Sequence, residues 1–320
     1  MKKSVSKFLQ VFIPLALGGF LIGYFYSKFT PAQWEELVKH FKNANYWIVL
    51  ISVLLSVLSH VIRASRWDFM LEPLGYRPRL LNSFFAVSTA YFMNLFIPKS
   101  GEVSRAVILD KYEKVPFEKG FGTIISERIV DLFFLLIFIL MAVTLQFDEL
   151  YGYLTQLVPI KKIVMALGIL VAGGIAFFFF LKKSKGALSK KIKAFVKGLK
   201  EGVFSILKMK KKGAFILYSI FIWALYLLSF YTATKALPET SIIGLGTLII
   251  TFVVGSFTFA FTNSGLGYYP LAIAGILLIF GIPETVGTAL GWIVWTSNVI
   301  YILVSGVLSM ILLPIFNRGK

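Results

Sequence analysis

Seven ionisable side chains lie in stretches that are otherwise apolar, and these residues offer the chain's main potential for chemistry. They form three clusters, Arg63 with Arg66, Glu102 with Arg105, and Glu127 with Arg128 and Asp131. Residues three or four apart share one face of a helix, and charges in such segments usually face a bundle interior. The planar fork of arginine suits a phosphate group, whereas a carboxylate either receives an amine or holds the arginines when the site is empty. We therefore expect one charged pocket.

Each cluster also has a simpler explanation. Arg63 and Arg66 close an apolar run, where long basic side chains can snorkel to the membrane interface. The group from Glu127 to Asp131 would equally make a salt-bridge network at the membrane boundary. In the pocket hypothesis the clusters pair with one another, and we expect Glu102 to be a partner of Arg105.

A fourth polar group is rich in glycine and follows a long apolar run. It begins with Asn263, Ser264, Gly265, Gly267 and Tyr268. Trp292, Trp295 and Asn298 follow it, although aromatic residues of a membrane belt would explain the tryptophans equally well.

Several kinds of site are not indicated. The chain has no cysteine and two histidines, His40 and His60, so we expect no disulfide, no metal centre and no cofactor. We find no nucleophile–base pair and no phosphate-binding loop motif. We therefore predict that the protein is not an enzyme, since an enzyme would depend on Glu102, Glu127 or Asp131 alone as acid or base.

The composition predicts an all-α integral membrane protein, a polytopic helical bundle in a single membrane domain of residues 1–320. Of the 320 residues 58% are hydrophobic, the mean hydropathy is +0.81, and the apolar runs are continuous. We expect an uncleaved first span rather than a signal peptide, because a long apolar run lacks a small-residue cleavage site. The six predicted full spans are residues 8–27, 46–62, 121–146, 160–181, 213–234 and 287–313.

The positive charge predicts the orientation. The net charge is +18, and 27 of the 33 Lys and Arg residues fall on one side of these spans. The positive-inside rule then places both termini in the cytoplasm, and we expect a multi-pass protein of a bacterial-type cytoplasmic (inner) membrane. Because loop topology explains the charge, we expect no nucleic acid partner.

Two further apolar regions, residues 80–110 and 242–281, begin and end on the same side of the membrane. Each has a Ser-Gly turn near its middle, at Gly101 and Gly265. We expect re-entrant or broken hairpins that enter from opposite sides, with tips that approach each other, as in an inverted repeat. The alternative is two ordinary pairs of spans. The halves would be residues 8–181 and 213–314.

Between the halves, residues 182–212 form a basic linker. From residue 185 onward apolar residues repeat at helical spacing and lysines fill the other face. We expect an amphipathic helix on the anionic lipids of the inner leaflet, with a solvated linker as the alternative.

The motifs, taken in order, resemble the lysylphosphatidylglycerol synthase transmembrane-region family of flippase-like proteins, over about residues 8–314. They read Arg63-x-x-Arg66-Trp67, Ile97-Pro98-x-x-Gly101-Glu102-x-x-Arg105, Glu127-Arg128-x-x-Asp131, Ser264-Gly265-Leu266-Gly267 and Gly281-Ile282-Pro283. The family's second motif usually has Gly where Ser264 stands and Glu where Tyr269 and Pro270 stand. A late arginine of the family is also missing.

The resemblance implies a bundle around a lipid cavity that moves a polar-headed phospholipid between leaflets. The lipid would be anionic or aminoacylated, such as an aminoacylated phosphatidylglycerol. We expect no soluble aminoacyl-transferase domain, because the chain ends soon after its last span. The alternative function is a non-transporting membrane partner of a glycosyltransferase or cell-envelope assembly complex, and no particular protein partner is indicated. The predicted headgroup-binding residues are Arg63, Arg66, Asn94, Gly101, Glu102, Arg105, Glu127, Arg128, Asp131, Asn263, Ser264, Gly265, Gly267 and Tyr268.

Overall fold

The computed structural model describes residues 29–147, 208–262 and 264–318, and the isolated residues Gly19, Gly23, Ser27 and Phe204. All regular structure in this part of the chain is helical, which confirms the predicted fold class. The predicted spans 8–27 (apart from Gly19, Gly23 and Ser27) and 160–181, and most of the linker 182–212, lie outside the described residues. The elements are α2 (Pro31–Asn43), α3 (Tyr46–Leu71), the 3₁₀ turn η1 (Glu72–Leu74), α4 (Leu80–Phe96), α5 (Ser100–Glu113), α6 (Phe117–Leu145), α11 (Lys212–Thr234), α12 (Leu245–Phe261), α13 (Tyr268–Ile279) and α14 (Glu284–Phe316).

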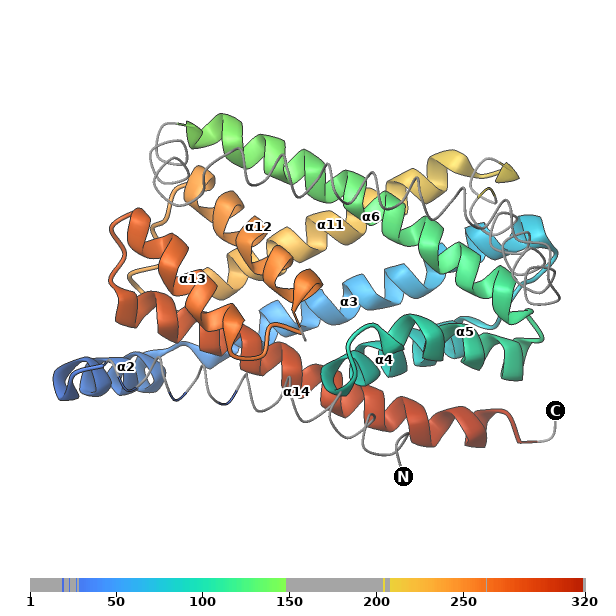
Figure 1. Cartoon of the computed structure of the whole chain (residues 1–320), viewed down its shortest axis with the longest axis horizontal. Coiled ribbons are helices and arrows are strands. Elements are labelled where there is room, and N and C mark those ends of the chain that lie inside the picture. The colour runs from blue at the N-terminus through green and yellow to red at the C-terminus, as the bar shows by residue number, and fades with distance from the viewer. Residues whose placement is uncertain are drawn as a thin grey trace, which may run out of the picture.

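Four helices, α3, α6, α11 and α14, are long and apolar enough to cross a membrane. They correspond to four of the predicted spans, and Figure 1 shows them running roughly along the long axis of the molecule. The helix of the second predicted span, residues 46–62, is longer than that span. Helix α3 continues through Arg63 and Arg66 to Leu71, and both arginines are paired inside the bundle.

The two predicted hairpins are present as pairs of shorter helices. Helices α4 and α12 have 17 residues each and α13 has 12. At 1.5 Å per residue these are about 26 Å and 18 Å long, less than a bilayer core of about 30 Å. The pair α4–α5 lies toward one end of the long helices and the pair α12–α13 toward the other, with their turns near the middle (Figure 1).

The turns of the two hairpins contact each other. Ser264 Oγ donates to the carbonyl oxygen of Asn94 at 3.3 Å, and Lys99 Nζ donates to that of Ala260 at 2.6 Å. The prediction that the hairpin tips meet is therefore confirmed.

Helix α14 carries both hairpins, and glycines make the close approach possible. A Cβ atom added at Gly291 would lie 2.6 Å from the Cα atom of Pro270 in α13, and one added at Gly306 would lie 2.3 Å from the Cβ atom of Phe92 in α4. The first half of α14 thus packs on the second hairpin, and the second half packs on the first hairpin.

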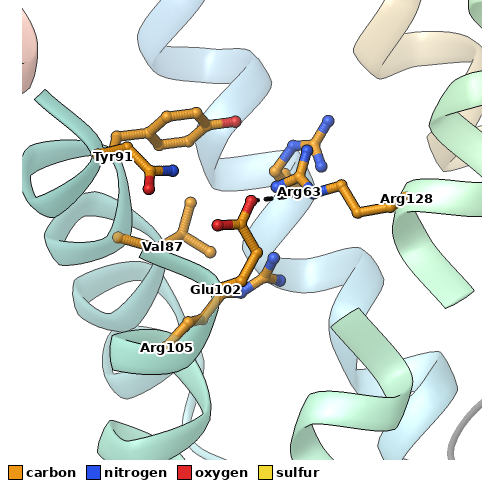
Figure 2. Close-up of a pocket in the computed structure, with 8 residues that line it drawn as sticks. Arg63, Val87, Tyr91, Glu102, Arg105 and Arg128 are labelled. Carbon is orange, nitrogen blue, oxygen red and sulfur yellow. Dashed lines mark ion pairs between the residues drawn. The ribbon is translucent and has the colours of Figure 1, made fainter. Parts of the chain in front are cut away.

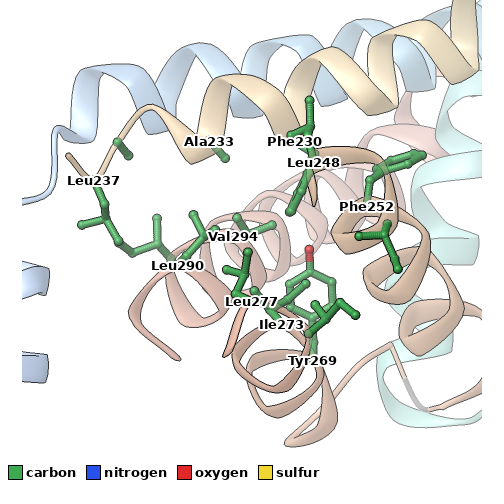
Figure 3. Packing of buried hydrophobic residues seen from close by; sticks show 14 of the residues in the cluster. Phe230, Ala233, Leu237, Leu248, Phe252, Tyr269, Ile273, Leu277, Leu290 and Val294 are labelled. Atoms are coloured by element: carbon green, nitrogen blue, oxygen red, sulfur yellow. The ribbon is translucent and has the colours of Figure 1, made fainter. Parts of the chain in front are cut away.

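Buried apolar side chains form two clusters. One joins α11, α12, α13 and α14 through residues such as Phe230, Phe252 and Leu290 (Figure 3). The other gathers Trp67, Leu109 and other residues of α3, α4, α5 and α6. The second cluster includes Trp67, Ala106 and Ile124, which lie close in sequence to the charged residues of α3, α5 and α6.

Candidate functional site

The charged residues of α3 and α6 face each other in the protein interior. Arg63 Nη1 contacts Glu127 Oε1 and lies 2.8 Å from Asp131 Oδ2. Arg66 Nη2 lies 3.3 Å from Asp131 Oδ1. Because both pairs sit one turn apart on their helices, one crossing of α3 over α6 brings all four side chains together.

Arg105 adds a third arginine from α5. Its Nη1 lies 3.0 Å from Glu127 Oε1 and its Nη2 lies 2.8 Å from Glu127 Oε2, which is the two-pronged geometry that a guanidinium and a carboxylate favour. Its guanidinium also lies over the Trp67 ring, 3.8 Å from the centroid, and Trp67 Nε1 donates to Thr123 Oγ1. These contacts fix the plane of the arginine.

Burial decides between the alternatives for the arginines. Arg63, Arg66 and Arg105 are at most 2% exposed, so the explanation by snorkelling side chains is wrong. Glu127 is fully buried and Asp131 is 9% exposed. Buried charges are stable only when they are paired, and here each carboxylate contacts at least two arginines. The network lies inside the helical bundle.

Glu102 does not pair with Arg105 as expected. Its Oε1 lies 3.5 Å from Nε of Arg128, and its Oε2 is buried with no hydrogen-bond partner among the described residues. Although Glu102 and Arg105 share a face of α5, Glu127 reaches Arg105 from α6 with both oxygens. Arg128 also approaches Asp131 at 3.4 Å, and its side chain is 44% exposed. Arg128 is therefore the accessible end of the network.

The first hairpin turn sets the direction of α5 and so of Glu102 and Arg105. Gly101 N donates to Asn94 Oδ1 at 2.8 Å, and Ser100 Oγ donates to the carbonyl oxygen of Ile97 at 2.7 Å. A Cβ atom at residue 101 would lie 2.2 Å from the carbonyl oxygen of Ala90. Glycine is needed here because α4 and α5 touch backbone to backbone.

A narrow pocket opens beside the network, between α3, α4, α5 and α6. Arg63, Asn94, Glu102, Arg105 and Arg128 line it, together with Val87, Ala90 and Tyr91. Figure 2 shows the arginines and Glu102 on one side of this space and Tyr91 and Val87 on α4. The free space is little more than that of one water molecule.

Three of the pocket residues were not singled out from the sequence. Val87, Ala90 and Tyr91 precede Asn94 at the spacing of one helix face, and that periodicity was the available signal. The ring of Tyr91 stacks on buried His60 at 4.4 Å between centroids. His60 Nδ1 in turn lies 2.8 Å from Tyr301 Oη, so it is a packed histidine that supports the pocket wall.

Helix α11 supplies two hydroxyl partners that sequence reasoning also missed. Arg66 Nη1 donates to Ser219 Oγ at 2.9 Å, and Arg63 Nε donates to Tyr226 Oη at 3.1 Å. The two hydroxyl residues are seven apart and share a face of α11. Their sequence positions do not show that this face lies against the arginines of α3.

The second glycine-rich turn does not line the pocket. Ser264, Gly265 and Gly267 have positive φ angles, and Trp295 Nε1 donates to the carbonyl oxygen of Ser264 at 2.9 Å. Ser264 contacts Asn94, a residue of the pocket wall, and Tyr268 is exposed at the start of α13. Asn263 lies outside the described residues.

The fold and the site define a multi-pass helical membrane protein with an arginine–carboxylate network at a narrow interior pocket. A profile of the family "Lysylphosphatidylglycerol synthase TM region" matches residues 11–306, and the chain belongs to that family. The resemblance drawn from its motifs is thereby confirmed.

Two curated relatives are archaeal. A UPF0104 membrane protein of Methanocaldococcus jannaschii is 32% identical over 112 residues, 34% of this chain and 33% of the relative. A UPF0104 membrane protein of Methanothermobacter thermautotrophicus is 25% identical over 164 residues, 50% of this chain and 45% of the relative. The matches thus span less than half the length of each relative. No solved structure matches the chain.

Proposed function

We propose that this protein binds a phospholipid headgroup at the arginine network and moves that lipid between leaflets, without catalysing a reaction. The observation that carries the proposal is an excess of arginine at an interior pocket. Four arginines, Arg63, Arg66, Arg105 and Arg128, meet three carboxylates, so the network has one positive charge in excess. A phosphodiester carries one negative charge and would balance it.

The accessible end of the network indicates how a phosphate would enter. Arg128 is the exposed arginine, and its 3.5 Å contact with Glu102 is longer than the 2.8 Å contact between Arg105 and Glu127. A phosphate that approached Arg128 would displace Glu102, whose free oxygen then accepts an amine. An anionic or aminoacylated lipid, such as aminoacylated phosphatidylglycerol, suits this arrangement.

The proposed place of action is a cytoplasmic-type membrane with both termini inside. This orientation rests on the distribution of Lys and Arg among the loops. Inner-leaflet anionic lipids are then the proposed contact of residues 182–212.

A second candidate function has support from the pocket itself. In the present conformation the pocket is too narrow for a headgroup, and the buried arginines already have carboxylate partners. A sealed bundle of this kind also suits a non-transporting partner of a glycosyltransferase or envelope assembly complex. The transport proposal therefore requires the pocket to open.

Native mass spectrometry of the purified protein tests the binding step. We expect a phosphate-bearing lipid to co-purify, Arg105→Ala to lose it, and Arg105→Lys to retain part of it, since lysine keeps the charge and loses the fork. Arg77→Ala is the matched control, because Arg77 is an exposed arginine that pairs with Glu72. Lipid is counted per folded molecule, with thermal stability measured beside it. Unchanged lipid in Arg105→Ala would reject the proposal in favour of the partner function.

A further inference from the structure

Lys99, at the tip of the first hairpin, differs from the arginines of the network. Its side chain is exposed, and its ammonium donates to the carbonyl oxygen of Ala260 at 2.6 Å, near the end of α12. Within the described residues no carboxylate lies within ion-pairing distance of it. Arg63, Arg105 and Arg128 each contact at least one carboxylate. The charge of Lys99 is therefore not balanced by an acidic side chain.

The position of the tip makes this charge unusual. The turns of both hairpins lie near mid-length of the molecule in Figure 1, between the ends of the long apolar helices. Phe96, Ile97 and Pro98, which precede Lys99, are exposed as well. An uncompensated charge among exposed apolar side chains, midway along the long apolar helices, is costly. An anion beside it would lower that cost.

The tip is also continuous with the arginine pocket. Asn94 lines the pocket, and its carbonyl oxygen accepts from Ser264 Oγ of the second hairpin at 3.3 Å. Lys99 contacts the same second hairpin through Ala260. The junction of the two tips thus lies beside one wall of the pocket and is reached from outside the bundle.

We infer that Lys99 forms a second phosphate-binding position at the hairpin junction, distinct from the arginine pocket. The inference rests on the proposed function and adds a step to it. On its path, the lipid phosphate first passes α12–α13, then contacts Lys99 at the hairpin junction, and then enters the pocket beside α4–α5. To do so, the ammonium exchanges the carbonyl of Ala260 for a phosphate oxygen, which is a charge-assisted contact.

A purely structural role for Lys99 makes a different prediction. A lysine near the end of a helix stabilises its last carbonyl groups, and removing that contact would loosen the hairpins for every lipid alike. A phosphate-binding role affects lipids with a net negative headgroup most, because in phosphatidylcholine the choline cation offsets the charge of the phosphate and weakens its attraction to Lys99. Lys235 offers a matched control, because its ammonium also contacts a backbone carbonyl, that of Ser241, in the α11–α12 connection.

The test uses the full chain in phosphatidylcholine vesicles with a trace of fluorescent phosphatidylglycerol or fluorescent phosphatidylcholine, and measures transbilayer movement of each. We expect Lys99→Gln to slow the transbilayer movement of phosphatidylglycerol about tenfold. A tenfold change corresponds to about 1.4 kcal/mol, the size of one charge-assisted contact. Lys99→Arg should restore most of the rate, and Lys235→Gln should match the unmodified chain. Co-purified lipid should remain in Lys99→Gln, because the arginine pocket is intact.

Two results would overturn the inference. If Lys99→Gln moves phosphatidylglycerol as fast as Lys235→Gln does, Lys99 has no phosphate ligand. If Lys99→Gln slows both lipids equally, the role of Lys99 is structural. Failure of the proposed function gives a different result from failure of the Lys99 inference. In that case the unmodified chain moves neither lipid, and Arg105→Ala keeps its co-purified lipid.

Discussion

Arg105 and Glu127 form a two-pronged ion pair between α5 and α6, with nitrogen–oxygen distances of 3.0 and 2.8 Å and at most 2% exposure of either side chain. The pair joins the first hairpin to a long helix. Because Arg63 contacts the same carboxylate, Glu127 is the centre of the network.

Removing the charge of Glu127 should destabilise the protein strongly. In Glu127→Gln the buried Arg63 and Arg105 lose their shared carboxylate, and breaking a buried ion pair costs about 3–5 kcal/mol. We expect a lower midpoint of thermal unfolding in detergent. Glu35→Gln is the control, because Glu35 is exposed on α2. Equal midpoints for the two variants would contradict a central role for Glu127.

Gly101→Ala should disrupt the first hairpin. The added Cβ atom would lie 2.2 Å from the carbonyl oxygen of Ala90, and overpacking of this kind costs about 2 kcal/mol. Gly275→Ala is the matched control, since no atom lies within 4 Å of the corresponding Cβ in α13 and alanine favours a helix. Thermal unfolding should separate the two, with Gly101→Ala lower than the unmodified chain and Gly275→Ala at least as high.

The second hairpin turn should depend on Trp295. Trp295→Phe keeps one aromatic ring and removes the indole N–H that donates to the Ser264 carbonyl, and the loss of this hydrogen bond costs about 1 kcal/mol. We expect faster hydrogen exchange in residues 262–268 and unchanged exchange in α6. The control Trp47→Phe alters a side chain that is 77% exposed and should leave that turn unaffected. Unchanged exchange in Trp295→Phe would show that other contacts hold the turn.

The predicted orientation can be tested with single cysteines, because the chain has none of its own. Lys39 on α2 is exposed and should face outward, whereas Asp110 on α5 is exposed and should face the cytoplasm. In intact cells an impermeant thiol reagent should label Lys39→Cys and not Asp110→Cys. Lysed cells control for reactivity, since both variants should then react. The reverse pattern in intact cells would mean that the termini face outward.

Much of the architecture was predictable because hydropathy is a local property. Four of the predicted spans appear as long apolar helices, and turns between shorter helices lie at Pro98-Lys99, just before Ser100-Gly101, and at Ser264-Gly265. Helix boundaries were less predictable where charge interrupts the apolar pattern. Arg63 was read as the end of a span, although α3 continues to Leu71.

The sequence by itself determined the class of protein, the apolar helices, the hairpin turns and the set of charged residues, because each depends on neighbouring residues alone. Tertiary structure decided the partners. Arg105 binds Glu127 rather than Glu102. Tyr91 lines the pocket, and its ring stacks on His60 of α3. These choices depend on where helices cross, and residues on one helix cannot specify which residue of another lies opposite. The width of the pocket likewise follows from that packing.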